Sequence, residues 1–184
     1  MRRCLVIGCG PDVWSEVAEA EAMTDFDAVI CVKLAGVFWP RPFYAWATLH
    51  PEFMPRYTAM RDERGYPGGH QIVGPLEAEL GTKNRAFHVD RRLSYRWKGM
   101  NASGASGLYG VKIAMDDGFD QIVCAGIPMT SEPHFARNLS SWKERGSFMR
   151  GWELALPILK GRVKSMSGWT REKLGAPTPE WLAG

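Results

Sequence analysis

The sequence lacks the signatures of several large enzyme classes. It contains no GxxxxGK[ST] loop, which excludes an ordinary P-loop enzyme. It has no HExxH motif and no cysteine and histidine cluster with zinc spacing, so the metal sites built on those motifs are excluded as well. The GxSxG turn of acyl hydrolases is also missing. We therefore expect no metal and no resident cofactor, and any nucleotide that binds does so as a substrate.

Disulfide bonds and membrane spans are equally unsupported. The cysteines are Cys4, Cys9, Cys31 and Cys124. They show no CxxC spacing, so we expect free thiols that pack as small hydrophobic side chains. The apolar run after Arg3 is too short for a signal peptide, and no apolar segment is long enough to cross a bilayer. These features predict a soluble protein of the reducing cytoplasm.

The charge balance argues against nucleic acid as a partner. The 184 residues include 23 lysines and arginines against 20 aspartates and glutamates, a formal net charge of +3. This excess is too small, and the basic residues are too scattered, for a nucleic-acid-binding surface. A mildly basic chain of this length suits one domain that binds a small anionic ligand.

The most informative stretch is 101–128, which predicts a loop, a helix and a strand in succession. The small residues of 103–107 form a loop that brings backbone N–H groups close to a ligand. Apolar residues at roughly helical spacing follow over 108–117, and Gly118 is the expected helix stop. Gln121–Ala125 is a short apolar run typical of a buried parallel strand, with glycine at its carboxyl edge. The ligand-binding residues expected here are Ser103, Gly104 and Gly126.

A second binding loop is expected near the N-terminus. The apolar run 4–7 leads into a tight Gly-Cys-Gly-Pro turn and then into a helix over Val13–Met23. This is half of a dinucleotide fingerprint, because the full GxGxxG pattern is absent. A strand, glycine turn and helix present N–H groups and a helix dipole to a phosphate, and a purely structural turn is the alternative. The residues of this turn are Gly8, Cys9, Gly10 and Pro11.

Three further candidates follow strands at the same expected edge of the sheet. Lys33 follows the strand Ala28–Val32, His50 follows a third strand over 45–49, and His134 lies in the loop after the central strand. A lysine at this edge either contacts a phosphate or sugar hydroxyl or is a solvated charge. A loop histidine either takes part in proton transfer or is merely exposed. We expect Lys33 to bind the ligand and the two histidines to be the catalytic residues.

The order of the expected elements indicates one α/β domain over 1–184. Strands alternate with helices, and glycines stand at the strand ends, which predicts a Rossmann-like, doubly wound and mostly parallel sheet with helices on both faces. Beyond the loop after the central strand we expect a helix or turn at 142–145. A helix over 148–160 and a last strand over 162–166 follow it.

Three segments are patterned less clearly. The segment 64–99 is basic and poorly patterned apart from a short strand at 71–73, and the tail 170–184 is expected to be loose. The aromatic stretch 36–44 contains two prolines, so we expect neither a helix nor a central strand there. It is predicted to line either an acceptor pocket or the interface of a homo-oligomer.

Two blocks of the chain resemble a known family. The first strand and its Gly-Cys-Gly-Pro turn resemble the nucleotide-binding start of bacterial lipooligosaccharide sialyltransferases, in which a GNGPS-type turn is typical. The block 102–128 is similar to their Ser-Gly loop, helix, strand and closing GID. Both blocks also resemble the 6-hydroxymethylpterin diphosphokinase-like family, whose last strand and turn resemble 163–169. The segment 64–99 resembles neither family.

The resemblance implies a nucleotide-binding enzyme, which in the sialyltransferases uses a cytidine monophosphate sugar. It implies that the turn 8–11 lies on the phosphate side and that the Ser103-Gly104 loop covers the nucleotide. His134 falls near a tyrosine that contacts the donor phosphate in that family, and His50 falls where the family has asparagine.

Three positions depart from the sialyltransferase pattern. Cys9 replaces an asparagine, Pro128 replaces the aspartate of GID, and no histidine follows His134, although the sialyltransferases use a downstream histidine as general base. The base is then His134 or His50. Three functions stay open: a metal-independent, sialyltransferase-like glycosyltransferase, a nucleotide or pterin diphosphotransferase, and a non-catalytic nucleotide-binding protein. The second is disfavoured, because Pro128 removes the likeliest ligand for Mg²⁺.

Overall fold

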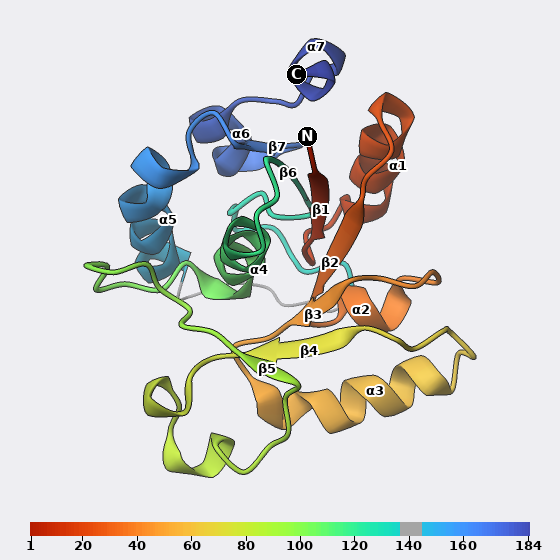
Figure 1. The fold of residues 1–184 in the computed structure, drawn as a ribbon, viewed down its shortest axis with the longest axis vertical. Helices are drawn as coiled ribbons and strands as arrows, with labels where there is room; N and C mark the ends of the chain where they lie inside the picture. Colours follow the sequence, from red (N-terminus) through yellow and green to blue (C-terminus); the bar gives the residue numbers. More distant parts are fainter. Residues whose placement is uncertain (137–144) are drawn as a thin grey trace.

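The computed structural model describes residues 1–136 and 145–184, which fold around one sheet. Its seven strands run in the spatial order β5-β4-β3-β2-β1-β6-β7, and every neighbouring pair is parallel (Figure 1). The strands are β1 (Arg3–Ile7), β2 (Ala28–Val32), β3 (Ala45–Ala47), β4 (Gln71–Gly74), β5 (Arg91–Arg92), β6 (Gln121–Ala125) and β7 (Val163–Ser165). The predicted Rossmann-like α/β fold is confirmed.

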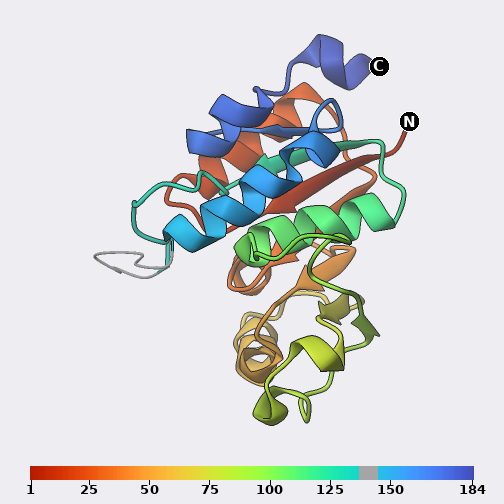
Figure 2. The same cartoon turned by 90° about the vertical axis from the view of Figure 1, so that its left-hand side faces the viewer.

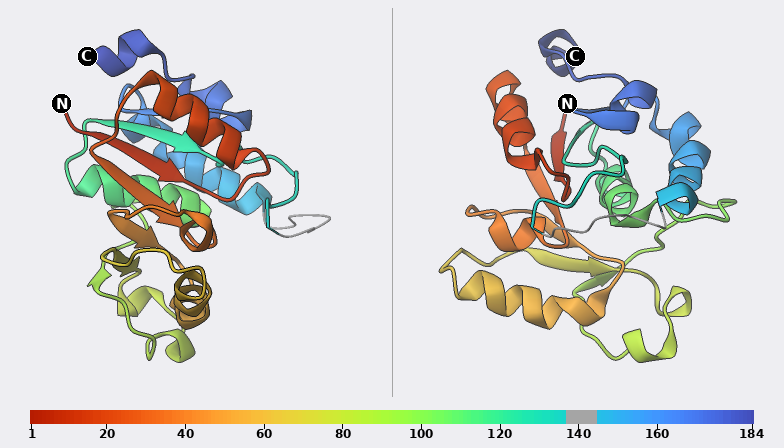
Figure 3. Two further views of the ribbon diagram at one scale, coloured as in Figure 1. Left: turned by 90° about the vertical axis from the view of Figure 1, so that its right-hand side faces the viewer. Right: turned by 180° about the vertical axis from the view of Figure 1, so that it is seen from behind.

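Helices cover both faces of this sheet. Figure 2 shows α4 and α5 over one face, and the left panel of Figure 3 shows α1 over the other. The first face carries α4 (Ala105–Asp116), α5 (Arg145–Leu159) and α6 (Gly168–Leu174). The second face carries α1 (Val13–Met23), α2 (Ala35–Phe38), α3 (Met54–Asp62) and the C-terminal α7 (Pro179–Ala183). The remaining helical turns are the 3₁₀ segments η1 (Pro51–Phe53), η2 (Glu77–Glu79) and η3 (Thr82–Asn84).

Alternation along each strand divides the core between the two faces. In β1, Cys4 and Val6 pack in the cluster under α4 and α5, whereas Leu5 and Ile7 pack in the cluster under α1, α2 and α3. This is the period of two that a strand buried on both faces must have. It explains why the central strands read as continuous apolar runs in the sequence.

The winding of the chain sets the position of a site. From β1 the chain steps through β2, β3, β4 and β5 in one direction, and it then crosses over to place β6 on the other side of β1. The loops that leave β1 and β6 therefore turn toward opposite faces of the sheet. Open α/β sheets bind their ligands in the crevice that this reversal creates at the carboxyl edge.

Two segments differ from the sequence-based expectation, and a third lies almost wholly outside the described residues. The aromatic stretch 36–44 begins inside a short helix, α2, where no helix was expected. The tail 170–184 is expected to be loose, but it contains the end of α6 and all of α7, because Leu174 and Leu182 are buried in the two core clusters. The helix or turn expected at 142–145 lies outside the described residues, apart from Arg145 at the start of α5.

A buried arginine explains why α2 forms in spite of its sequence. Arg61 of α3 is 1% exposed, and among the described residues its guanidinium donates only to backbone carbonyl groups. Its acceptors are the carbonyls of Gly36, Trp39, Arg41 and Pro67. These bonds satisfy carbonyl groups at the end of α2 and in the loop behind it, so tertiary contacts rather than helix propensity hold this segment.

We expect Arg61→Met to lower the free energy of unfolding by about 3 kcal/mol, because it leaves several buried carbonyl groups without donors. Urea denaturation measures the change as a lower midpoint with an unchanged slope. Arg56→Met on the exposed side of the same helix is the control, with an expected change below about 0.5 kcal/mol. Equal effects of the two substitutions would contradict this role of Arg61.

Candidate functional site

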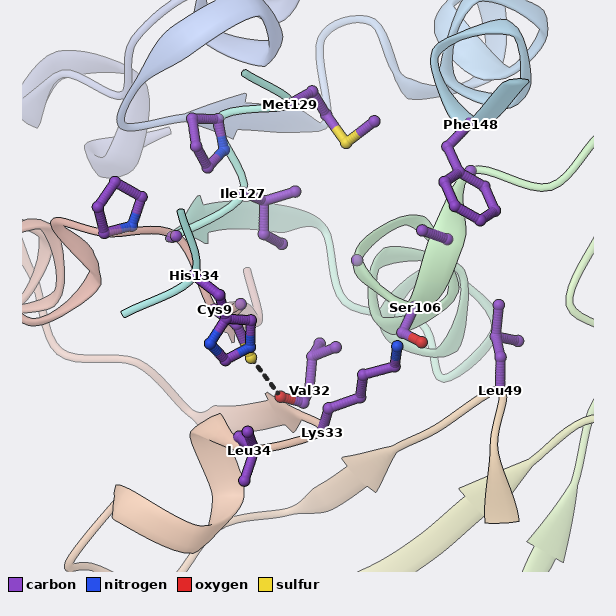
Figure 4. A pocket seen from close by; sticks show the side chains of 18 of the residues that line it. Cys9, Val32, Lys33, Leu34, Leu49, Ser106, Ile127, Met129, His134 and Phe148 are labelled. Atoms are coloured by element: carbon purple, nitrogen blue, oxygen red, sulfur yellow. Dashed lines mark hydrogen bonds between the residues drawn. The ribbon is translucent and has the colours of Figure 1, made fainter. Parts of the chain in front are cut away.

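A cavity of about 530 Å³ opens at the carboxyl edge of the sheet, at the reversal between β1 and β6. The loops that follow β1, β2, β3 and β6 line it, together with the first turn of α4 and Phe148 of α5 (Figure 4). A volume of this size falls in the range of small-molecule and cofactor sites. The cavity therefore lies where the fold predicts a ligand site.

Most of the site residues expected from the sequence come together here. Those that line the cavity are Gly8, Cys9, Gly10, Pro11, Lys33, His50, Gly104, Gly126 and His134. Ser103 does not line it. The Ser103 hydroxyl accepts a hydrogen bond from the Ala105 N–H group at 3.2 Å, and its backbone packs against Gly151 of α5. Ser103 thus shapes the loop before α4 from behind.

The Gly-Cys-Gly-Pro turn has a structural role, which was the alternative left open by the sequence. The Gly8 N–H group donates to the Ala125 carbonyl and the Gly10 N–H group to the Gly126 carbonyl, both at 2.7 Å. A Cβ atom at Gly8 would lie 2.3 Å from the Gly126 carbonyl oxygen. Glycine is required because the two loops touch, and these two donors are occupied within the protein instead of facing a phosphate.

A buried carboxylate occupies the start of α1. Glu16 is 8% exposed, and its Oε2 accepts a hydrogen bond from the Gly126 N–H group at 2.7 Å. Gly126 has a φ of +68°, and a Cβ atom there would lie 2.5 Å from the Val13 side chain. Glu16 is an acidic side chain in the first turn of α1, so it already offsets the positive end of the α1 dipole and makes that end less attractive to an anionic ligand. The geometry does not favour a phosphate at the 8–11 turn.

The N-terminus of α4 is the better anion site. Ser106 is 4% exposed, and its Oγ has no hydrogen-bond partner among the described residues. The N-cap residue of α4, Gly104, has no side chain to offer, and the Ser103 hydroxyl accepts from the Ala105 N–H group. The other N–H groups of the first turn have no intrahelical partner. Figure 4 shows Lys33 extending from the end of β2 toward Ser106. A buried hydroxyl, helix N–H groups and a lysine together suit a phosphate.

The sequence-based prediction named Ser103, whereas the serine of the small-residue run that lines the cavity is Ser106. Both Ser103 and Ser106 lie in the small-residue run 103–107. Helix α4 begins at Ala105, so Ser103 precedes the helix and Ser106 lies in its first turn, facing the cavity. The position of Ser106 in the sequence could have identified it, because a side chain in the first turn of a helix lies beside the free helix N–H groups.

Backbone strain is concentrated at this cavity. Among the described residues, the non-glycine residues with positive φ are Lys33 (+48°), Ala105 (+61°) and Met129 (+52°), and all of them line the cavity. The Lys33 carbonyl accepts a hydrogen bond from the Trp46 indole at 2.6 Å, which holds its unusual backbone in place. Such conformations cost about 1–3 kcal/mol each and persist where the surrounding structure imposes them, as at binding sites.

The two candidate histidines are held by different neighbours. His50 Nδ1 lies 3.0 Å from Glu52 Oε1. His134 Nδ1 accepts a hydrogen bond from the Ala136 N–H group at 3.2 Å. The loop that carries His134 is fixed at the cavity because the Phe135 N–H group donates to the Cys9 carbonyl at 3.1 Å.

The described residues include no group of three His, Cys, Asp or Glu side chains that converge as metal ligands. Asp25 and Asp27 have a DxD spacing but precede β2 at the opposite edge, where Asp27 accepts a hydrogen bond from the Arg3 N–H group at 2.6 Å. None of the four cysteines forms a disulfide bond within the described part of the chain, and burial raises the pKa of three of these thiols, those of Cys4, Cys31 and Cys124. None of the described helices is long and apolar enough to cross a membrane.

Fold and cavity together define a Rossmann-like protein with a cavity at its topological switch point. No protein-family model matches the sequence, and no curated protein matches it. Among solved structures, the chain is similar to the sialyltransferase CstII from Campylobacter jejuni in complex with a substrate analogue, cytidine-5′-monophosphate. The TM-score is 0.59 at 16% identity, over 97% of this chain and 87% of that chain. The fold is therefore sialyltransferase-like, and the comparison does not support the pterin kinase alternative.

We expect Ala105→Gly to raise the free energy of unfolding by about 0.5–1 kcal/mol. Glycine relieves the strain of a positive φ, and this gain exceeds the added flexibility of the unfolded chain. Ala18→Gly, at an exposed position inside α1, is the control and should lower stability by about 1 kcal/mol. Thermal or urea denaturation measures the change in the free energy of unfolding for each substitution. A decrease for both substitutions would contradict the backbone strain at Ala105.

Proposed function

We propose that this protein binds a cytidine monophosphate sugar and acts as a metal-independent, sialyltransferase-like glycosyltransferase. The observation that carries the proposal is the anion-binding corner of the cavity. There the unpaired hydroxyl of Ser106 lies at the N-terminus of α4, and Lys33 extends toward it. The similarity in fold to a sialyltransferase studied with cytidine-5′-monophosphate supports this choice of nucleotide.

Ser106, Lys33 and the N-terminus of α4 can stabilise a nucleoside monophosphate as the leaving group. When the bond between sugar and phosphate breaks, negative charge builds up on the phosphate oxygens. Lys33 and the N-terminus of α4 offset this charge from fixed positions, and the Ser106 hydroxyl donates a hydrogen bond to it. Positive charge from the protein serves here in the place of a divalent cation.

The remainder of the cavity suits the nucleoside and the sugar. Apolar side chains from four different segments line it, as Figure 4 shows. They are Leu34 after β2, Leu49 after β3, Ile127 and Met129 after β6, and Phe148 of α5. A mostly apolar cavity with a few convergent polar groups is the usual form of a small-molecule site, in which the polar groups fix the orientation of the ligand.

A magnesium-dependent diphosphotransferase is the weaker candidate. Such chemistry needs carboxylates that hold Mg²⁺ against a diphosphate. Of the described lining residues Glu132 alone is acidic, and its Oε2 already accepts a hydrogen bond from the Thr130 hydroxyl at 3.0 Å. The carboxylates expected for that reaction are not grouped at this cavity.

We expect cytidine-5′-monophosphate to bind the full chain in the presence of EDTA, and Ser106→Ala to raise its Kd about tenfold, the cost of one hydrogen bond to a charged group. Isothermal titration calorimetry measures both quantities. Ser103→Ala is the matched control, because this hydroxyl lies on the same loop but outside the cavity, and its Kd should stay within about twofold.

Two results would contradict the proposed function. Absence of cytidine-5′-monophosphate binding by the wild-type protein removes its basis, and binding that requires Mg²⁺ favours the diphosphotransferase instead. Equal losses in Ser103→Ala and Ser106→Ala would contradict the placement of the phosphate at α4.

A further inference from the structure

The two histidines of the cavity are fixed in opposite tautomers. A neutral imidazole carries its proton on one ring nitrogen and a lone pair on the other, and a neighbouring hydrogen bond decides which nitrogen is which. His50 and His134 both use Nδ1 for that bond, but the partner of the first is an acceptor and the partner of the second is a donor. Their Nε2 atoms are therefore chemically different.

His50 has the tautomer of a base. The carboxylate of Glu52 accepts hydrogen bonds and cannot donate them, so the proton of neutral His50 lies on Nδ1, 3.0 Å from Glu52 Oε1. The lone pair is then on Nε2. The His50 N–H group donates to Thr48 Oγ1 at 2.9 Å, which fixes the backbone just after β3. His50 lines the cavity, and its side chain is 47% exposed, so a substrate hydroxyl can reach it.

His134 has the tautomer of a donor. Its Nδ1 accepts from the Ala136 N–H group, so the proton of the neutral ring lies on Nε2. In this form it donates a hydrogen bond and does not remove a proton. The ring stacks on Phe135, with centroids 5.2 Å apart, and Phe135 itself packs edge-on against Trp14 and Phe38.

Glu52 is held in position to orient His50. Its side chain is 25% exposed, and its second oxygen, Oε2, is buried without a hydrogen-bond partner among the described residues. Pro51 begins η1 directly after His50, which limits the backbone between the two side chains. The Glu52 carboxylate is partly buried and is held by its hydrogen bond to His50. An exposed surface ion pair, by contrast, contributes little to stability.

The two rings enter the cavity from different ends. The loop of His134 is bonded to the turn after β1 through Cys9, whereas His50 follows β3. Strand β2 lies between β1 and β3, so these ends are about 10 Å apart along the edge of the sheet, two strand spacings. The two rings therefore belong to different parts of the cavity wall.

We propose that His50, oriented by Glu52, is the general base of the transfer reaction and that His134 donates to the leaving phosphate; this proposal rests on the proposed function. The acceptor hydroxyl gives its proton to His50 Nε2 as its oxygen bonds to the anomeric carbon of the sugar. The bond between that carbon and the phosphate oxygen breaks, and the electron pair stays on the phosphate, which accepts a hydrogen bond from His134 Nε2. His50 later returns the proton to water. Glu52 is a positioning residue that acts through His50.

Release of cytidine-5′-monophosphate from CMP-sialic acid, with water as the acceptor, tests this assignment on the full chain. We expect His50→Ala to lower kcat about 10²–10⁴-fold while the Kd for cytidine-5′-monophosphate stays within about twofold. Added imidazole should restore part of the rate of His50→Ala. We expect Glu52→Gln to lower kcat about tenfold with KM unchanged, because the ring remains but is no longer oriented by a charge.

His88→Ala is the matched control. His88 and Asp90 form a pair with the same sequence spacing as His50 and Glu52, at 3.1 Å, but the His88 side chain is 81% exposed and lies outside the cavity. Its loss should leave kcat unchanged. His50→Asn is a second variant at the proposed base, so that a folding defect in His50→Ala, which thermal melting would reveal, does not decide the outcome.

The outcomes separate this inference from the proposed function. If the wild-type protein does not bind cytidine-5′-monophosphate, both fail. If it binds the nucleotide but releases none from CMP-sialic acid, or if both His50 variants keep the wild-type kcat, the base assignment is overturned and nucleotide binding stands. Rescue of His134→Ala by imidazole, without rescue of His50→Ala, would reverse the two roles and also overturn it.

Discussion

The contact between the loop after β1 and the loop after β6 is the constraint on which the rest of the site depends. Two hydrogen bonds of 2.7 Å join these loops, from Gly8 to Ala125 and from Gly10 to Gly126, and no side chain fits between them. The loops that make this contact form one wall of the cavity, and the ends of β2 and β3 and the start of α4 form the rest of its lining.

The same contact decides which helix faces an anion. The N-termini of α1 and α4 both open near the carboxyl edge, and either would attract a phosphate by its dipole. The carboxylate of Glu16, bonded to the Gly126 N–H group, places negative charge beside α1. Ser106 and Lys33 give α4 a hydroxyl and a positive charge instead. The two helix ends are thus made different by side chains, although the fold makes them alike.

Much of the fold could be predicted from the sequence because its strands are short apolar runs with clear ends. The expected bounds of β2 and β6 match the structure residue for residue, and the glycine loops lie at the expected edge. The features that the sequence did not predict depend on contacts with residues that are distant in the sequence. Helix α2 is held by Arg61, α7 by burial of Leu182, and the Gly8 donor is taken by Ala125. No local pattern contains those partners.

In the candidate site, too, the local sequence indicates which residues lie at the cavity, whereas tertiary contacts determine their chemical state. Residue type and strand position predicted His50 and His134 as site residues, and both line the cavity, but their tautomers follow from Glu52 and from the Ala136 N–H group. All the strands of a parallel sheet end at one edge, so different strand ends can supply a side chain to the same crevice. This chain shares its fold with a sialyltransferase at 16% identity, and its proposed base lies at one of these strand ends, after β3. The backbones of Lys33, Ala105 and Met129 are strained, and all three residues lie in loops or at a helix start beside the cavity, outside the strands of the sheet. Their conformations cost stability at the positions that shape the cavity.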